Sequence, residues 1–311
     1  MKHRPDCTIQ LADGRTLSFS RFGRSSAVPI LLFHGTPGSR CFGFPAGTPL
    51  DDGRVQVILP ERPGYGLSSA KPDRTVLNWA DDIRQLIDTL GFENVHLLGL
   101  SGGGPFALAC AHQIPERVLS VNLVASAAPL YLSQLRKEMA AVNKLAYYAA
   151  RFVPRAIQLN FLFNRYSLYH RPTVYLEKLF TQLSDWDEAL LRDPVTQALF
   201  LKHMREAYRN GIKGAISDIQ LLMKPWGFTL SEITGPVRLW QGELDTLIPA
   251  SMGRYLSAQL TNCQSDFISN AGHLLFLDQH YMNTILSAIC QDSSDSMVCA
   301  AHAVDDALNP C

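Results

Sequence analysis

The chain has 311 residues, of which 47% are hydrophobic and 18% are charged, so it has enough apolar side chain for a large core. This composition excludes a disordered chain. The 28 Lys and Arg residues balance the 28 Asp and Glu residues, so no long-range field attracts the chain to nucleic acid or to anionic lipid. We therefore expect a protein that acts on a small molecule and has no nucleic-acid partner.

The first residues are charged and no apolar stretch follows them, and no window reaches the roughly 18 apolar residues that a membrane helix needs. We expect no secretory signal and no stable membrane insertion. The 7 cysteines are scattered, odd in number and without C-x-x-C spacing, which argues against a disulfide framework and against a zinc site. Reduced thiols and a cytoplasmic location are the expectation, while the oligomeric state is left open.

Short β-rich runs alternate with helical patterns along the chain, which is typical of a mostly parallel sheet with helices on both faces. Between the strands predicted at 55–59 and 95–100, apolar residues recur every three or four positions from Val76 to Leu90. This spacing predicts a helix that ends at Gly91, a residue type favoured at helix C-termini. The strands are predicted at 16–22, 29–33, 55–59, 95–100, 120–125, 237–241 and 265–268.

The alternation stops after Pro129 and resumes at Gly235, and the intervening residues show helical patterns without a convincing strand. We assign residues 1–129 and 227–291 to one α/β core, 130–226 to a helical cap inserted in it, and 292–311 to a poorly ordered tail. The cap is rich in large apolar side chains that could line a pocket over the sheet edge. The candidate pocket residues are Tyr147, Phe161, Phe163 and Met204, although ordinary helix packing is an alternative explanation for each of them.

The strongest motif is G-L-S-G-G at residues 99–103, which lies directly after an apolar strand and before a helical run. A sharp strand-to-helix turn strains the serine backbone and crowds its neighbours, so small residues are needed on both sides. The helix N-terminus beneath the turn also favours an anion. This context predicts that Ser101 is a nucleophile.

A serine hydroxyl needs a base to take its proton, and His273 is the best candidate. It follows the last predicted strand, lies in a turn and precedes an apolar helical run, which places it at the same sheet edge as Ser101. His96 and His112 lie within regular elements, where a structural role is more usual. The sequence therefore predicts His273 as the general base.

Asp245 is the predicted acid that orients this histidine, because it lies in a loop just beyond the strand at 237–241. Glu243 is the competing acid, two residues earlier. Asp266 and Asp278 are poorer choices, since one falls in a strand and the other on a helix. The order of nucleophile, acid and base along the chain is the one expected for a nucleophile on a strand-to-helix turn.

An oxyanion needs two N–H donors aimed at one point, and the first is the backbone N–H of Gly102, next to the nucleophile. The second is expected in the loop at 34–38, where glycines let the backbone approach a substrate. The N–H of Thr36 is the best placed, because Pro37 has none. We expect His34 to shape this loop rather than to act as a base.

These motifs together resemble the α/β-hydrolase superfamily over residues 10–290. The resemblance is carried by His34-Gly35, by Glu61-Arg62-Pro63-Gly64-Tyr65-Gly66 with Ser68, by the turn at Ser101, by Gly242 and Asp245 with Ile248-Pro249, and by Gly272-His273. It implies an eight-stranded sheet, a helical cap between the sixth and seventh strands, and a Ser-His-Asp triad without metal or organic cofactor. The 34–37 loop also resembles that of epoxide hydrolases and haloalkane dehalogenases, but those carry an aspartate nucleophile where this chain has Ser101.

The resulting hypothesis is a serine hydrolase that cleaves a carboxylic ester, or a related thioester or lactone, of a modest apolar substrate through an acyl-enzyme on Ser101. A peptidase of the proline-iminopeptidase kind lacks an obvious acidic anchor for a free amine. A non-catalytic small-molecule receptor on the same shell is an alternative, as are a cofactor-free lyase, an acyltransferase and a C–C hydrolase. These stay open because a fold does not determine a function.

Overall fold

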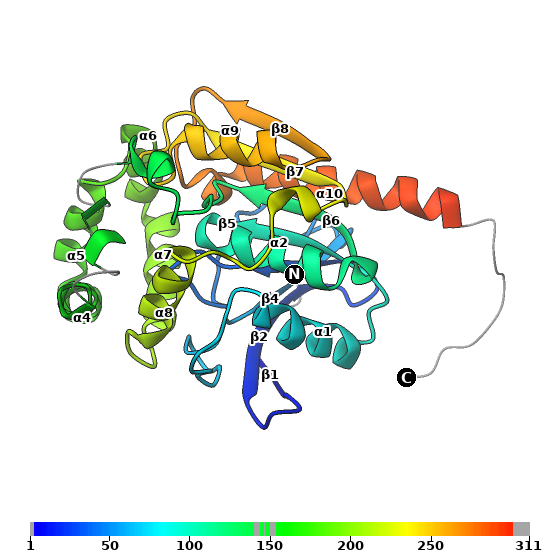
Figure 1. The fold of residues 1–311 in the computed structure, drawn as a ribbon, viewed down its shortest axis with the longest axis horizontal. Coiled ribbons are helices and arrows are strands. Elements are labelled where there is room, and N and C mark those ends of the chain that lie inside the picture. The colour runs from blue at the N-terminus through cyan, green and yellow to red at the C-terminus, as the bar shows by residue number, and fades with distance from the viewer. Residues whose placement is uncertain (1–2, 140–143, 146, 150–153, 301–311) are drawn as a thin grey trace.

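The computed structural model describes residues 3–139, 144–145, 147–149 and 154–300, and its centre is a single eight-stranded sheet (Figure 1). The strands are β1 (His3–Gln10), β2 (Thr16–Gly23), β3 (Val28–Phe33), β4 (Val55–Pro60), β5 (Val95–Leu100), β6 (Val118–Val124), β7 (Val237–Gly242) and β8 (Cys263–Ile268). They lie in the order β1-β2-β4-β3-β5-β6-β7-β8. β2 pairs in antiparallel fashion with both of its neighbours, β1 and β4, and all other neighbouring strands of the sheet pair in parallel. The mostly parallel eight-stranded sheet predicted from the sequence is confirmed.

Helices cover both faces of this sheet, and the alternation of side chains along the strands explains why two cores form. In β3, Leu31 and Phe33 face the core that contains α1 (Asn78–Leu90), α2 (Gly104–Gln113) and α9 (Ala250–Gln259). Ile30 and Leu32 face the second core, which contains the first part of α10 (Gln279–Ala300). α1 ends as predicted, with Gly91 in the left-handed region at φ 71°.

Strand register brings the carboxyl ends of the central strands to one edge of the sheet. Phe33 at the end of β3 lies beside Gly99 in β5, and Leu100 at the end of β5 lies beside Val124 at the end of β6. Loops that follow β3, β5, β7 and β8 therefore emerge at this edge, where ligands bind in open α/β sheets.

Between β6 and β7, the residues that the structure describes form helices and no strand. We call α4 (Pro154–His170), α5 (Pro172–Phe180), α6 (Asp185–Arg192), α7 (Pro194–Ala207) and α8 (Lys213–Leu222) the inserted helices. They gather at one end of the sheet (Figure 1). α4, α5, α7 and α8 share a core that includes Phe161, Tyr175 and Met204, whereas Leu191 of α6 packs in the second core of the sheet. The remaining short turns are 3-10 helices: η1 (Ser101–Gly103), η2 (Pro115–Arg117), η3 (Ser133–Arg136), η4 (Leu230–Glu232) and η5 (Leu275–Leu277).

Two segments differ from the sequence-based expectation. β1 was not predicted, because it is a strand at the sheet edge that includes no apolar run and whose side chains from Asp6 to Gln10 alternate between exposed and half-buried. α10 continues to Ala300, so a helix occupies residues 292–300 where a poorly ordered tail was expected; residues 301–311 lie outside the described part. Within the described ranges, none of the helices is both long enough and apolar enough to cross a membrane.

Candidate active site

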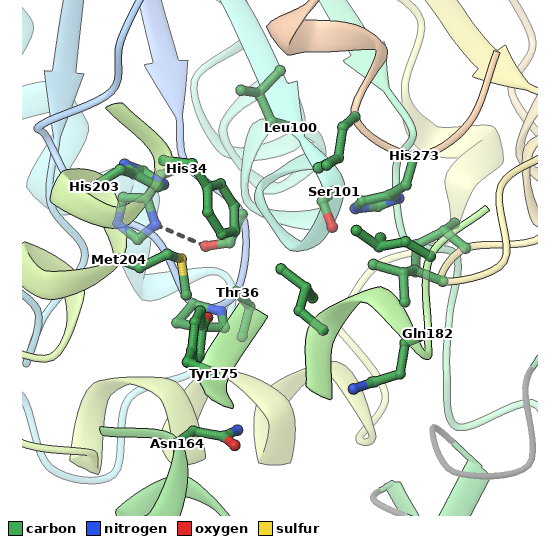
Figure 2. A pocket seen from close by; sticks show the side chains of 18 of the residues that line it. His34, Thr36, Leu100, Ser101, Asn164, Tyr175, Gln182, His203, Met204 and His273 are labelled. Atoms are coloured by element: carbon green, nitrogen blue, oxygen red, sulfur yellow. Dashed lines mark hydrogen bonds between the residues drawn. The ribbon is translucent and has the colours of Figure 1, made fainter. Parts of the chain in front are cut away.

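Ser101 lies on the sharp turn between β5 and α2, and its backbone has the strained left-handed conformation expected of such a turn, with φ 51°. Gly103 allows this turn to fit against the neighbouring strand, since a Cβ at that position would lie 2.2 Å from the carbonyl oxygen of Phe33. The turn holds the Ser101 side chain in a cavity at the carboxyl edge of the sheet. Figure 2 shows its hydroxyl beside the ring of His273.

His273 and Asp245 come together from the loops that follow β8 and β7. The Nδ1 atom of His273 donates to Oδ2 of Asp245 at 2.8 Å, which leaves Nε2 as the ring nitrogen that can take a proton. The other carboxylate oxygen of Asp245 accepts the backbone N–H groups of Leu247 at 2.9 Å and Ile248 at 2.8 Å. Glu243, the competing acid, lies at the surface and pairs with Arg254.

The electrostatic surroundings of His273 favour its protonated form. Burial acts to lower the pKa of this imidazole, but the carboxylate of Asp245, and secondarily that of Asp187, outweigh burial and leave the pKa above its usual value. A base with a raised pKa accepts a proton more readily and needs a somewhat higher pH to be neutral.

Asp187 is a second carboxylate at this histidine, and sequence reasoning did not find it. It lies on α6, is fully buried, and accepts the backbone N–H of His273 at 3.0 Å and that of Leu274 at 2.7 Å. The Ser184 hydroxyl also donates to it at 2.7 Å. An inserted helix thus holds the loop that carries His273. No local signal in the sequence indicates this contact, because 86 residues separate the two partners.

The two predicted oxyanion donors lie next to each other. A Cβ built on Gly102 would be 3.3 Å from the backbone nitrogen of Thr36, so the loop after β3 passes directly over the turn at Ser101. The Thr36 hydroxyl is engaged elsewhere, since it donates to Asp218 on α8 at 3.1 Å. This arrangement leaves the Thr36 backbone N–H as the group of that residue available to an oxyanion.

A buried ionic network holds the loop that contains Thr36. Two residues of the motif at 61–66, Arg62 and Tyr65, belong to this network, and the sequence analysis did not predict this role. Arg62 donates to the Gly35 carbonyl at 2.7 Å and pairs with Asp218 at 2.8 Å. Arg74 also pairs with Asp218, and the Tyr65 hydroxyl donates to it at 2.8 Å. Burial acts to raise the pKa of Asp218, but the two guanidinium groups prevail and hold its pKa well below the usual range.

His34 supports the same loop, as expected from the sequence. It is completely buried, its Nδ1 atom hydrogen-bonds the Gly35 carbonyl at 2.8 Å, and its Nε2 atom accepts the backbone N–H of Arg62 at 3.3 Å. Burial lowers the pKa of this imidazole well below its usual value, so it is neutral near pH 7.

The cavity beside Ser101 has a volume of about 270 Å³ and is lined mainly by apolar side chains. Three of the four predicted pocket residues line it, namely Tyr147, Phe161 and Met204. The prediction for Phe163 is wrong: its side chain is 48% exposed and it does not line this cavity. Phe163 follows Phe161 by two positions on α4, and two helical residues turn by about 200°, so the two rings point to opposite sides. Among the described residues, no three His, Cys, Asp or Glu side chains gather into a group that could hold a metal ion.

Comparison with known proteins agrees with this fold. The model of the alpha/beta hydrolase fold family matches residues 28–279, which is most of the chain. The chain therefore belongs to the alpha/beta hydrolase fold family and is a hydrolase of that fold.

The relatives differ in what they act on. The chain is 25% identical to the uncharacterized hydrolase YcgS of Bacillus subtilis over 278 residues. This alignment covers 88% of this chain and 93% of that protein. It is 26% identical over 257 residues, 80% of this chain and 81% of the relative, to a 2-hydroxy-6-oxononadienedioate/2-hydroxy-6-oxononatrienedioate hydrolase of Cupriavidus pinatubonensis. Among solved structures it is similar in fold to an esterase from Exiguobacterium antarcticum, with a TM-score of 0.67 and 20% identity over 91% of this chain and 98% of that one.

Proposed function

We propose that this protein hydrolyses a carboxylic ester of a small, largely apolar substrate through an acyl-enzyme on Ser101. The observation that carries the proposal is that the strained Ser101 and His273 line one cavity, and that the Nδ1 atom of His273 is hydrogen-bonded to Asp245 at 2.8 Å. Nucleophile, base and orienting acid are the parts that covalent acyl transfer requires.

In the proposed mechanism, the Ser101 hydroxyl oxygen attacks the ester carbonyl while Nε2 of His273 takes the hydroxyl proton. The carboxylate of Asp245 stabilises the imidazolium that forms, and the backbone N–H groups of Gly102 and Thr36 donate to the oxyanion. The tetrahedral intermediate collapses when the imidazolium gives its proton to the leaving alcohol. Water, deprotonated by His273, then attacks the acyl-enzyme. The bond between the acyl carbon and the Ser101 oxygen breaks as the imidazolium returns the proton to that oxygen, and the carboxylic acid is released.

The dimensions and lining of the cavity support a small substrate. Its volume of about 270 Å³ lies at the lower limit of small-molecule sites, which are commonly about 300 to 1,000 Å³. The lining includes Phe161 and Met204 of the inserted helices, which we propose act as a cap that selects the acyl chain. Binding energy from such remote contacts can be used to position the carbonyl at Ser101.

A second candidate is the hydrolysis of a carbon–carbon bond next to a ketone, using the same residues. The similarity to 2-hydroxy-6-oxononadienedioate hydrolases favours it, because that substrate name contains a ketone and no ester. Ser101 or a water activated by His273 would attack the ketone, and the leaving group would be a stabilised carbanion that needs a proton. The chemistry of attack is shared, so only the substrate separates the two candidates.

The test is turnover of p-nitrophenyl esters from acetate to decanoate, beside a 2-hydroxy-6-oxo-dienoate, by the wild type and by Ser101→Ala. We expect ester turnover with an initial burst in the wild type, none in the folded Ser101→Ala variant, and labelling of Ser101 by a fluorophosphonate. Ser126→Ala is the matched control, because Ser126 is also buried but hydrogen-bonds the Ala127 carbonyl outside the cavity lining.

Each other outcome contradicts the proposal in a distinct way. Faster cleavage of the ketone than of every ester would replace ester hydrolysis by carbon–carbon hydrolysis. Binding of esters without turnover would identify a receptor. Activity retained in Ser101→Ala would remove Ser101 as the nucleophile.

A further inference from the structure

Besides the polar residues around Ser101, the cavity lining contains a second polar group, formed by Asn160 and Asn164 of α4, Lys178 of α5 and Gln182 just after α5. All four side chains line the same cavity as Ser101. Figure 2 shows Asn164 and Gln182 on the side of the cavity opposite Ser101. A molecule whose carbonyl lies at Ser101 would therefore present its far end to these polar groups.

Lys178 is the charged residue of this group, and its ammonium has only neutral partners. Its Nζ atom donates to Oδ1 of Asn160 and to Oδ1 of Asn164, both at 2.7 Å, and lies 5.1 Å from the centre of the Phe163 ring. Across the described ranges, no carboxylate comes within ion-pair distance of it. The other partly or wholly buried cations near the site differ in this respect, since Arg62 pairs with Asp218.

The half-buried ammonium is therefore short of negative charge. Burial lowers the pKa of Lys178, because the ammonium has lost part of its water and amide dipoles replace it only in part. His34 and His203, which also line the cavity, are neutral, as burial lowers the pKa of His203 to about 4 and that of His34 well below its usual value. Apart from His273, Lys178 is thus the cationic group among the described residues that line the cavity.

The amide groups around Lys178 also present donors rather than acceptors. Both asparagine oxygens are occupied by the ammonium, so the amide nitrogens of Asn160 and Asn164 face outward from this contact. A positive charge with N–H donors beside it is the arrangement that binds a carboxylate.

We propose that Lys178, with Asn160, binds a carboxylate that the substrate carries at the end remote from its scissile carbonyl. The substrate class is then a half-ester: an apolar acyl chain with an ester at one end, which reaches Ser101, and a free carboxylate at the other. This rests on the proposed function, because the scissile ester is placed at Ser101. The apolar middle of the cavity contacts the chain between the two polar ends.

The experiment compares two matched series of p-nitrophenyl esters with acyl chains derived from adipic to sebacic acid. In one series the remote carboxylate is free, and in the other it is capped as a methyl ester of almost the same size. For the wild type we expect kcat/KM to be at least about tenfold higher for the free carboxylate at the chain length that spans the cavity. A ratio of one or less at every chain length would overturn the proposal, and this result needs no variant.

Variants assign the preference to the lysine. Lys178→Met should reduce the free-to-capped ratio to near one, Lys178→Arg should keep part of it, and Lys178→Glu should favour the capped series. Lys213→Met on α8 is the matched control, because Lys213 is exposed and does not line the cavity. A ratio that stays within twofold of wild type in Lys178→Met would refute the assignment.

The outcome also separates this inference from the proposed function. Turnover of both series at equal rates, lost in Ser101→Ala, would sustain the ester hydrolase and reject the carboxylate site. If neither series is cleaved, the proposed function fails, and binding of suberic acid monoamide to the wild type, measured by calorimetry, tests the carboxylate site alone. Weaker binding to Lys178→Met than to Lys213→Met would support the site, whereas equal binding or none would reject it.

Discussion

Replacement of Asp187 by asparagine tests whether the inserted helix α6 sets the position and the charge environment of His273. The carboxylate of Asp187 accepts two backbone N–H groups, from His273 at 3.0 Å and from Leu274 at 2.7 Å, one on each oxygen. Asparagine keeps one acceptor oxygen and turns the other into an NH₂ group. One backbone N–H of the histidine loop then faces a donor instead of an acceptor.

The size of the effect follows from these contacts. A hydrogen bond to a charged group contributes about 1.5 to 3 kcal/mol, and an unpaired buried donor costs about 1 to 3 kcal/mol. Because Asp187 is fully buried and one of its two N–H contacts is lost, we expect the free energy of unfolding to fall by about 2 to 4 kcal/mol. A displacement of the imidazole by roughly 1 Å costs up to about a hundredfold in rate, so kcat/KM should fall by about 10- to 100-fold.

The pH profile separates a lost charge from a merely loosened loop. The negative charge of Asp187 contributes to raising the pKa of His273, so Asp187→Asn should move the acid limb of kcat/KM to lower pH while the plateau falls. Urea unfolding and a pH series of ester hydrolysis measure both effects. Asp185→Asn removes the same charge from an exposed position on the same helical turn and is the matched control. An unchanged acid limb, or an equal loss in Asp185→Asn, would refute the reasoning.

Three further outcomes are expected. Because only the neutral ring of His273 is a base and its pKa is raised, the midpoint of the acid limb of wild-type kcat/KM should lie above about pH 6.5, the ordinary pKa of histidine. A profile that is flat down to about pH 4, with chemistry rate limiting, would contradict this expectation. Phe161→Ala should change the ratio of kcat/KM between a short and a long ester by roughly 10- to 200-fold, because Phe161 lines the cavity. Phe163→Ala, at an exposed position, should leave this ratio within about twofold of wild type. Equal ratios in both variants would contradict a selective role of the inserted helices. Asp218→Asn leaves two buried guanidinium groups without their carboxylate, so urea unfolding should show a loss of about 3 to 5 kcal/mol in the free energy of unfolding. Glu243→Gln, at an exposed ion pair, should change that free energy by less than about 1 kcal/mol. Similar losses in the two variants would show that burial of the network is unimportant.

The sheet was predictable from the sequence where its strands are buried on both faces. β3, β4 and β5 consist mainly of apolar residues, interrupted only by Gln56 in β4 and His96 in β5, so their pattern alone indicates interior strands. β1 was missed because an edge strand is held by backbone pairing to β2 and needs no apolar run. The last part of α10, residues 292–300, was missed because the apolar periodicity weakens beyond residue 291, where little in the sequence distinguishes a helix from a coil.

The residues of the predicted triad were predictable because each follows a recognisable strand at the same sheet edge. Ser101 lies within a local motif after β5, and Asp245 and His273 follow the last two strands, β7 and β8. Asp187, Asp218 and Lys178 carry no such signal. They lie on helices whose sequence periodicity indicates a buried face, but which loop or cavity that face meets depends on how the inserted helices pack. The prediction for Phe163 was wrong for the same reason, since the direction of its side chain depends on how α4 is oriented about its own axis against the other helices.

Two sheet-side loops of the candidate site are anchored to carboxylates that belong to the inserted helices. Asp187 on α6 holds the loop of His273, and Asp218 on α8 holds the loop of Thr36 through its hydroxyl and through Arg62. The insertion is therefore not an interchangeable module. A chimera that receives residues 154–222 from a relative will keep both loops in place only if the transplanted helices supply acceptors at these two points, so substrate range and catalytic competence must be exchanged together.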